Sequence, residues 1–386
     1  MSEPATPEPL RPSRRGLLTG AIGGVLGLAA GAAAVGEHAQ PHGVTVSTGA
    51  LEPVPAAGKH QAGIHLPPTP QRFGVLAVLD VQAAAAGDWL AALGARILDL
   101  TSGREGGDIL PDGPGDLTVT VGIGPRVAER FGSGASHVED MPPFAGDSGI
   151  PADLNGGDLL IAAYSSDPTV LGVVLDDLIA LAPGARERWR QFVFRGHGSG
   201  SKARNPLGFM DGIVVPKTDA ELAESVWISD GPAAGGTILV VRRLKLDARG
   251  FRSKPVGERE AVIGRRLSDG APLSGGKPDD QVDLRAKTPE GEFLVPAASH
   301  ARAAHPSFTG SPLMLRRSYS FENDGDTADS GLVFMSYQND LATFVKTQQR
   351  LDEVDALMDF TTPTASAAFL ILPGFDSTRA LGSTLA

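Results

Sequence analysis

The sequence of 386 residues contains no cysteine. This absence excludes thiolate catalysis, iron–sulfur clusters and metal sites built from cysteine ligands. It does not name a compartment, because a large exported domain can be stable without disulfides. Aromatic residues are also scarce, at 5% of the chain, with three tryptophans and three tyrosines.

Positive charge and several catalytic signatures are lacking as well. The formal net charge is −11 and no basic stripe runs through the chain, so we expect no nucleic-acid partner. No G-x-S-x-G, no P-loop, no strand-linked G-x-G-x-x-G and no His-x-x-x-His pair with a helical carboxylate is present. Hydrolase and nucleotide-binding functions therefore have no motif to support them. The 41% of hydrophobic residues is typical of a globular protein with one large domain or two ordinary ones.

The first 34 residues have the pattern of an export signal. Residues 13–18 (SRRGLL) place two arginines before an apolar run at 17–35, and the small residues 32–34 form an A-x-A-like cleavage site. The twin arginine predicts export by the Tat machinery to the periplasm or the extracellular space. Tat carries folded proteins, often with a cofactor inserted. The alternative is a retained membrane anchor, since a run of ~19 residues is just long enough to span a bilayer.

An extended lead-in rich in glycine, proline and alanine is expected at 35–58, followed by a first domain at 59–225. Its apolar pattern alternates between strand and helix in the order β-α-β-(α)-β-α-β, which is ferredoxin-like. The expected strands are 73–81, 117–122, 159–164 and 189–194, and the expected helices are 89–100, 125–131 and 169–181.

A second series of elements predicts another split β-α-β unit at 226–386. The expected strands are 238–246, 332–337 and 367–372, the expected helices are 258–267 and 340–360, and a polar loop covers 268–290. The fold class is therefore α+β. Two ferredoxin-like domains lie side by side in a barrel-like arrangement, with antiparallel sheets and peripheral helices.

Two loops carry the candidate chemistry. In residues 204–212 (RNPLGFMDG), glycines flank Asp211, so the backbone can approach a flat ligand and aim the carboxylate. The alternative is a plain Asp-Gly turn. Residues 299–306 (SHARAAHP) offer His300 as an axial ligand, with Arg302 and the later Arg316 as partners for an anion. The alternative is a basic surface segment.

At these residues the chain resembles the Tat-exported branch of the dye-decolourising (DyP-type) haem peroxidases, which includes deferrochelatase/peroxidase-like members. The resemblance extends from about residue 58 to 376. It is carried by the segments 60–64 (HQAGI), 208–212 (GFMDG), 299–302 (SHAR), 315–320 (LRRSYS) and 331–338 (GLVFMSYQ). Alanine replaces the family's isoleucine at 301 and serine its glycine at 318, which leaves the ligand, the acid and the arginine in place.

The resemblance implies a haem b site and a role for each matching residue. His300 corresponds to the proximal ligand of the haem iron, and Asp211 and Arg316 correspond to the distal catalytic pair. Asp359 is expected to accept a hydrogen bond from the proximal histidine, and Arg302 to lie near a haem propionate. His305 is the rival ligand. The other expected cofactor-binding residues are Gly208, Phe209, Met210 and Gly212.

The implied function is reduction of hydrogen peroxide and oxidation of organic one-electron donors, such as dyes or phenols, through a ferryl intermediate. One alternative is a deferrochelatase that releases iron from haem, and another is a non-enzymatic periplasmic haem-binding protein. A homo-oligomer is left open. As electron relays the sequence offers Tyr319, Tyr337 and the three tryptophans Trp89, Trp189 and Trp227, for which ordinary core packing is the alternative.

Overall fold

The computed structural model describes residues 51–103, 108–135, 137–324 and 329–385. The expected export signal and most of the expected lead-in lie outside these residues. Residues 50–386 cluster into one compact unit. None of the described helices is long and apolar enough to cross a membrane.

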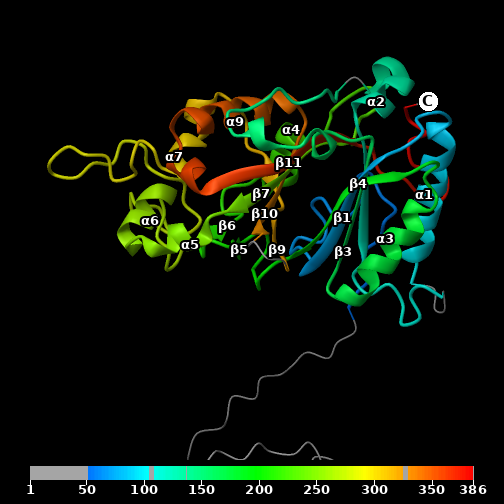
Figure 1. The fold of residues 1–386 in the computed structure, drawn as a ribbon, viewed down its shortest axis with the longest axis horizontal. Coiled ribbons are helices and arrows are strands. Elements are labelled where there is room, and N and C mark those ends of the chain that lie inside the picture. Colours follow the sequence, from blue (N-terminus) through cyan, green and yellow to red (C-terminus); the bar gives the residue numbers. More distant parts are fainter. Residues whose placement is uncertain (1–50, 104–107, 136, 325–328, 386) are drawn as a thin grey trace, which may run out of the picture. The chain divides into compact units, whose positions relative to one another are not determined.

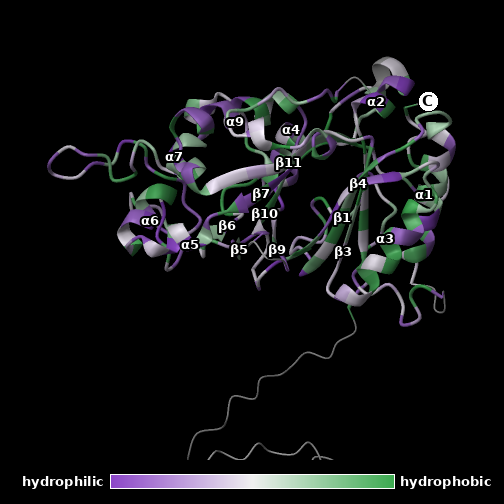
Figure 2. Cartoon of the chain, in the orientation of Figure 1, coloured by the Kyte–Doolittle hydropathy of each residue, from purple (hydrophilic) through white to green (hydrophobic). Residues whose placement is uncertain are grey.

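The first half of the described chain is a ferredoxin-like unit. Its strands are β1 (Phe73–Asp80), β2 (Thr118–Ile123), β3 (Leu159–Ser165) and β4 (Arg186–Phe194). Its helices are α1 (Ala86–Leu100), α2 (Pro125–Ala128) and α3 (Leu171–Ile179), with the 3₁₀ turns η1 (Glu129–Ala135), η2 (Asp147–Gly149), η3 (Ala152–Leu154) and η4 (Pro168–Val170). The strands pair in the order β2-β3-β1-β4, and Figure 1 shows α1 and α3 together on one side of them. Hydrophobic residues, green in Figure 2, concentrate on β1, β3 and these two helices.

The second half repeats this strand order as β11-β7-β10-β9. Its strands are β7 (Thr237–Leu246), β8 (Leu315–Arg316), β9 (Tyr319–Asn323), β10 (Asp329–Gln338) and β11 (Thr361–Ile371). Its helices are α5 (Ala248–Ser253), α6 (Val256–Ile263), α7 (His300–Ala303), α8 (Pro306–Thr309), α9 (Leu341–Val354) and the 3₁₀ turn η5 (Ala356–Phe360). Between the halves lie β5 (Ala203–Arg204), β6 (Met210–Asp211) and α4 (Asp219–Ser225).

The two halves share one antiparallel sheet. Strand β4 pairs with β9, and β11 pairs with β2, so nine strands follow in the order β7-β11-β2-β3-β1-β4-β9-β10-β8. The further pairing of β7 with β10 closes the sheet into a barrel. The predicted α+β fold with two ferredoxin-like halves is thereby confirmed. The domain boundary at 225/226 falls between β4 and β7 and stays a prediction.

Side chains of β7 and β10 alternate between two environments, as the pleat of a strand requires. Val241 and Met335 point to the barrel interior, where they pack with the other residues of that core. Arg242, Leu244 and Phe334 point the other way and line a cavity. The outer face of the second half therefore carries the site, beneath the helices that cover it.

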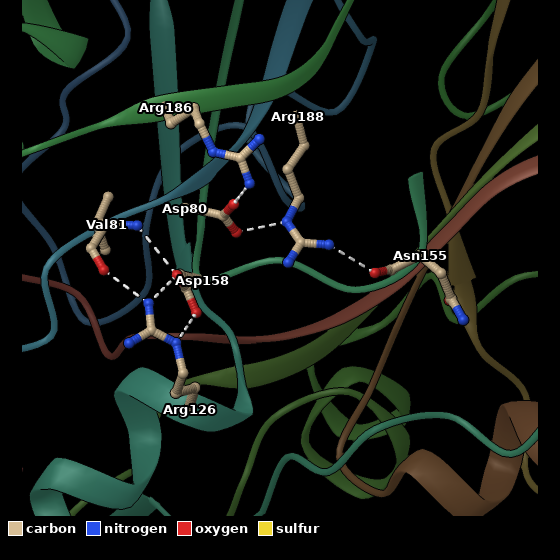
Figure 3. Close-up of polar contacts among 7 residues, drawn as sticks. All are labelled: Asp80, Val81, Arg126, Asn155, Asp158, Arg186 and Arg188. Atoms are coloured by element: carbon tan, nitrogen blue, oxygen red, sulfur yellow. Dashed lines mark hydrogen bonds and ion pairs between the residues drawn. The ribbon is translucent and has the colours of Figure 1, made fainter. Parts of the chain in front are cut away.

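A polar network fixes the ends of the first half's strands (Figure 3). Asp80 at the end of β1 pairs with Arg186 and Arg188 of β4. Asp158, which precedes β3, pairs with Arg126 of α2 and accepts a hydrogen bond from the Val81 amide at 3.0 Å. Burial raises the pKa of Asp80, but hydrogen bonds and charge from Arg188, then from Arg186, outweigh it and lower the pKa overall. These contacts tie β1, β3, β4 and α2 into one rigid block.

The two expected helices of the second half end earlier than the apolar pattern suggests. Helix α6 stops at Ile263 because Gly264 takes the left-handed conformation (φ 88°) that terminates a helix. Helix α9 stops at Val354, because Asp355 leaves the helical conformation and caps a new turn by accepting a hydrogen bond from the Leu357 amide. The second break places a carboxylate beside the candidate site.

Candidate functional site

A cavity of about 240 Å³ lies between the outer face of β7 and β10 and the helices of the second half. On the same measure one water molecule needs roughly 10–15 Å³, so the cavity admits an organic group. Its walls are mostly apolar and include Leu244, Leu246, Met314, Leu332, Phe334, Phe344 and Leu351. The ionisable residues that line it are Asp211, Arg242, Arg265, His300, His305 and Arg316. Apolar walls with a few placed polar groups are typical of cofactor sites.

His300 begins helix α7 and lies against a buried carboxylate. Its Nδ1 atom is 2.6 Å from Oδ2 of Asp355, whose side chain is fully buried, while 38% of the His300 side chain is exposed. The other Asp355 oxygen accepts the Leu357 amide at 2.9 Å. Burial by itself lowers the pKa of His300, but the charge of Asp355 and its hydrogen bond more than offset this and raise the pKa above its ordinary value. The hydrogen bond to Asp355 therefore fixes the His300 ring through Nδ1, and the other ring nitrogen, Nε2, takes no part in this bond.

The carboxylate partner of His300 is Asp355, so the prediction that Asp359 fills this position is wrong. Asp359 lies four residues after Asp355, inside the short helix η5 that Asp355 caps, and its side chain is exposed. The break of the helix at Val354 turns Asp355 inward, and a four-residue offset leaves Asp359 facing outward. The sequence offered several acids in this segment, and only the backbone path distinguishes them.

Asp211 and Arg316 come together at the cavity wall, as predicted. Nη2 of Arg316 lies 3.3 Å from Oδ1 of Asp211, and Nη1 donates to the Val214 carbonyl oxygen at 3.0 Å. Both side chains are 27% exposed, so each keeps a surface open to the cavity. Strand β6 supplies the acid and strand β8 the arginine, although 105 positions separate them in the sequence.

The two glycines around Asp211 are required by the backbone. Gly208 and Gly212 have φ angles of +91° and +75°, which other residues rarely adopt. A Cβ atom on Gly212 would lie 2.0 Å from the Ser201 carbonyl oxygen. Phe209, Met210 and Gly212 line the cavity as expected, whereas Gly208 is not among its lining residues. The glycines therefore aim Asp211 through chain geometry.

Asp211 is held in its charged form. Burial raises the pKa of this carboxyl, but the charge of Arg316, the Gly212 amide that donates to Oδ1 at 2.6 Å, and the charge of Arg195 together bring the pKa below its ordinary value. An acid with this balance stays ionised at weakly acidic pH.

Arg302 does not line the cavity. Its guanidinium lies over the ring of Phe293 at 4.2 Å and that of Phe308 at 5.3 Å, and it donates to the Leu284 carbonyl oxygen at 2.8 Å. These contacts hold the long polar loop against α7 and α8. The resemblance implied that Arg302 lies near a haem propionate. The contacts of Arg302 with Phe293, Phe308 and Leu284 do not support that position.

His305 also lines the cavity but is held differently. Its Nδ1 atom accepts the Ser307 amide hydrogen at 3.1 Å, which caps α8. Because Nδ1 is an acceptor, the neutral ring carries its proton on Nε2. Burial, and then the charge of Arg302, lower the pKa of His305.

Two arginines of the cavity wall were missed by sequence reasoning. Arg242, only 2% exposed, forms an ion pair with Asp147 of η2, so a residue of the first half neutralises an arginine of the cavity wall. Arg265 donates to the carbonyl oxygens of Gly270 at 2.9 Å and Asp280 at 3.0 Å. A signal for Arg242 was present, since charged residues inside the apolar strand sequence TILVVRRLKL demand a buried partner or a ligand.

The proposed relay residues are buried in the two cores. Tyr319 and Tyr337 lie inside the barrel with Trp189 and Trp227, and Trp89 lies on the buried face of α1, in the other core. This packing fits the ordinary structural role, and their role as electron relays stays a prediction.

The geometry now has a counterpart among known proteins. The Dyp-type peroxidase N-terminal family matches residues 61–189, and the Dyp-type peroxidase C-terminal family matches residues 202–376. This chain belongs to the Dyp-type peroxidase family. A dye-decolorizing peroxidase of Thermobifida fusca is 34% identical over 79% of this chain and 76% of its own length. A deferrochelatase of Escherichia coli O157:H7 is 34% identical over 97% of both chains.

Solved Dyp-type peroxidases have the same fold. Ferric DtpA from Streptomyces lividans superimposes with a TM-score of 0.79 at 32% identity, covering 87% of this chain and 97% of that one. A DyP-type peroxidase from Streptomyces coelicolor gives a TM-score of 0.78 at 32% identity, covering 86% and 96%. Membership in the family confirms the predicted fold and enzyme class. This Dyp-type peroxidase is a haem-dependent oxidoreductase that acts on peroxide with an organic electron donor.

Proposed function

We propose that the large cavity holds haem b, with its iron bound by Nε2 of His300. The observation that carries the proposal is the buried Asp355 carboxylate 2.6 Å from His300 Nδ1, in the wall of a mainly apolar cavity. A carboxylate at Nδ1 takes the ring proton as a hydrogen bond and leaves a lone pair at Nε2 for a metal. The chain has no cysteine through which haem could be attached covalently, which favours haem b.

The hydrogen bond of His305 argues against this residue as the ligand. Its Nδ1 accepts the Ser307 amide, so its Nε2 carries the proton in the neutral ring and offers no lone pair. Binding iron at His305 would break the cap of α8 or charge the ring. His300 needs no such rearrangement, because Asp355 already fixes the required tautomer.

Asp211 and Arg316 are the groups proposed to act on hydrogen peroxide. Asp211, held ionised, takes the first proton of hydrogen peroxide on a carboxylate oxygen and returns it to the departing oxygen. Arg316 remains charged and stabilises the negative charge on that oxygen. The bound haem supplies the electrons for peroxide reduction and recovers them from the organic donor.

Arg265 is the best placed cation for a carboxylate of the haem. It lines the cavity, and these hydrogen bonds of its guanidinium go to backbone carbonyls and not to a carboxylate. Arg242 lines the cavity too, but Asp147 already neutralises it. Arg302, which the sequence suggested for this role, makes its contacts outside the cavity.

Dyes or phenol-like molecules are proposed as the organic donors, as in the relative named a dye-decolorizing peroxidase. Several relatives are named deferrochelatases, which makes iron release from haem the alternative for the same cavity. The products separate the two activities. Porphyrin fluorescence that grows with enzyme and haem supports iron release, and peroxide-dependent oxidation of the donor supports the peroxidase.

Export by the Tat pathway to the periplasm or the extracellular space is also part of the proposal. It is supported by the twin arginine in residues 13–18 and the apolar run after it. Replacing Arg14 and Arg15 by lysines should retain the protein in the cytoplasm. Export of this variant at the normal level would contradict the pathway.

The site is tested by the absorption spectrum of the haem-loaded protein. His300→Ala should lose the haem absorption band or shift it strongly, whereas His305→Ala should keep it. In stopped-flow mixing with hydrogen peroxide, Arg316→Leu and Asp211→Asn should each slow the spectral change by roughly 10²–10⁴-fold. Unchanged rates in both variants would refute the assignment of this pair.

A further inference from the structure

A second, much smaller cavity adjoins the proposed peroxide site. Its volume is about 10 Å³, which is room for about one water molecule. Asp211 and Arg316 line both cavities, so the small cavity and the large one meet at this pair. Among the described residues that line the small cavity, Asp211 is the only acid, and Arg195 and Arg204 accompany Arg316. The single carboxylate thus faces an excess of positive charge.

Arg195 is the unusual member of this group, because it is 8% exposed and its side-chain hydrogen bonds within the described residues go to backbone. Its guanidinium donates to the carbonyl oxygens of Ser201 and Ser318 and lies 5.8 Å from the ring centre of Tyr319. No carboxylate of the described chain forms an ion pair with it. A buried cation without such a partner is costly, so the nearest negative charge decides how it is stabilised.

That negative charge is Asp211. Asp211 pairs with Ala203 in the β5–β6 ladder, and the Ser201 hydroxyl donates to the Gly212 carbonyl oxygen at 2.7 Å. The segment that binds the Arg195 guanidinium therefore also fixes the backbone beside Asp211. The interaction is mutual. Burial, and then the neighbouring charge of Arg317, lower the pKa of Arg195, whereas the charge of Asp211 acts to raise it, and Arg195 in turn helps to lower the pKa of Asp211.

We propose that Arg195 is a positioning residue that acts through Asp211 across the small cavity and extends the peroxide reaction to acid pH. The inference rests on the proposed role of Asp211 as the proton acceptor. The charged groups around Asp211 are Arg316 from β8, Arg195 directly after β4, Arg204 of β5 in the wall of the same small cavity, and His300 from α7. Of these, Arg316 is proposed to stabilise the negative charge that develops on the departing oxygen of the peroxide. Arg195 is instead hydrogen-bonded to backbone carbonyls and keeps its position throughout the reaction.

The test is the pH profile of the rate with hydrogen peroxide in haem-loaded Arg195→Gln. The glutamine amide can still donate to a backbone carbonyl, so the variant removes charge with the least loss of contact. The acid limb, the part of the profile where the rate falls as the pH drops, should move to higher pH. A displacement of about one pH unit implies a roughly tenfold lower rate at the acid end. Near neutral pH the rate should stay within about twofold. Arg195→Lys keeps the charge and should restore the acid limb.

The affinity of the haem-loaded protein for cyanide, measured across the same pH range, gives a readout that needs no turnover, and its acid limb should move in the same direction. Arg243→Gln is the control for loss of a largely covered arginine: the Arg243 side chain is 13% exposed, pairs with Asp329 and lies 4.1 Å from the ring centre of Phe321, but it lines neither cavity. Its profile should not move.

The variant Asp211→Asn separates the two levels of the argument. If it keeps the acid limb, the proposed role of Asp211 fails. If it abolishes the acid limb while Arg195→Gln leaves the limb in place, the inference about Arg195 fails by itself. When both hold, adding Arg195→Gln to Asp211→Asn should change the profile no further, since the two residues then act through one group.

Discussion

Asp355→Asn is the substitution that tests the proximal side of the site most directly. The Asp355 carboxylate serves two donors, the His300 ring at 2.6 Å and the Leu357 amide at 2.9 Å. An asparagine has one oxygen and one NH₂ group, so it can accept from only one of them through its oxygen. If the oxygen keeps the amide of Leu357, the NH₂ group faces His300 Nδ1 and forces the ring proton onto Nε2. The atom proposed to bind iron is then blocked.

The size of the effect follows from the two contacts. Loss of a carboxylate behind a metal-binding histidine costs about 10–100-fold in affinity, or about 1.4–2.8 kcal/mol. If the asparagine turns instead to accept from His300, the cap of η5 is lost, at about 1 kcal/mol of protein stability. Either haem affinity or the stability of the haem-free protein must therefore fall. The full burial of Asp355 makes rescue by water from outside unfavourable.

The assay is haem transfer from the loaded protein to an excess of a globin that binds haem tightly, with thermal unfolding of the haem-free protein alongside. Asp359→Asn is the matched control, since Asp359 lies in the same turn and is exposed. It should release haem at the normal rate. The reasoning is refuted if Asp355→Asn matches the unsubstituted protein in both assays, or if Asp359→Asn shows the larger loss of haem.

Three further predictions concern His300, the ion pair of Arg242 and the backbone at Gly212. Because Asp355 raises the pKa of His300, protons compete with iron for Nε2 from a higher pH than at an ordinary histidine. Haem affinity should therefore fall as the pH drops through that raised value. In Asp355→Asn the fall should start at a lower pH. Asp147→Asn leaves the buried Arg242 unpaired and should destabilise the protein by about 3–5 kcal/mol in denaturant unfolding, whereas Asp177→Asn at the more exposed Arg96 pair should cost less than about 1 kcal/mol. Gly212→Ala places a Cβ atom 2.0 Å from the Ser201 carbonyl oxygen at a φ of +75°, so unfolding should show a loss of about 1–3 kcal/mol and the peroxide rate should fall with it; a variant with normal stability and rate would contradict the need for glycine.

Strand periodicity predicted most of the fold. The expected strands at 73–81, 159–164 and 238–246 correspond to β1, β3 and β7 within a residue or two. Strand β9 was missed although Tyr319 and Phe321 alternate with polar residues, because a run of five residues is too short to stand out from the sequence around it. Closure of the barrel was foreseen only as a fold class, since the pairings β4–β9 and β7–β10 join segments far apart in the sequence, and local propensity does not encode them.

The candidate site was predictable where short motifs constrain the backbone. Asp211 and Arg316 were paired through the resemblance to a known family; the glycine conformations now explain how the motif aims Asp211, and the 3.3 Å contact shows that Arg316 meets it. The arginines were harder. Arg302 follows His300 by two residues, yet helix geometry points it away from the cavity toward Phe293. Arg242 is distant in sequence, yet strand alternation points it in.

The choice between Asp355 and Asp359 shows where sequence reasoning reached its limit at this site. A continuous helix from 340 to 360 would place these two acids on the same face, four residues apart, and sequence alone could not rank them. The structure breaks the helix at Val354, so Asp355 becomes a cap with one oxygen on its own turn and the other on His300. One residue thereby ends a helix, starts a turn and fixes the tautomer of the proposed iron ligand. A change at Asp355 must therefore alter local folding and metal binding together, whereas a change at Asp359 reaches neither.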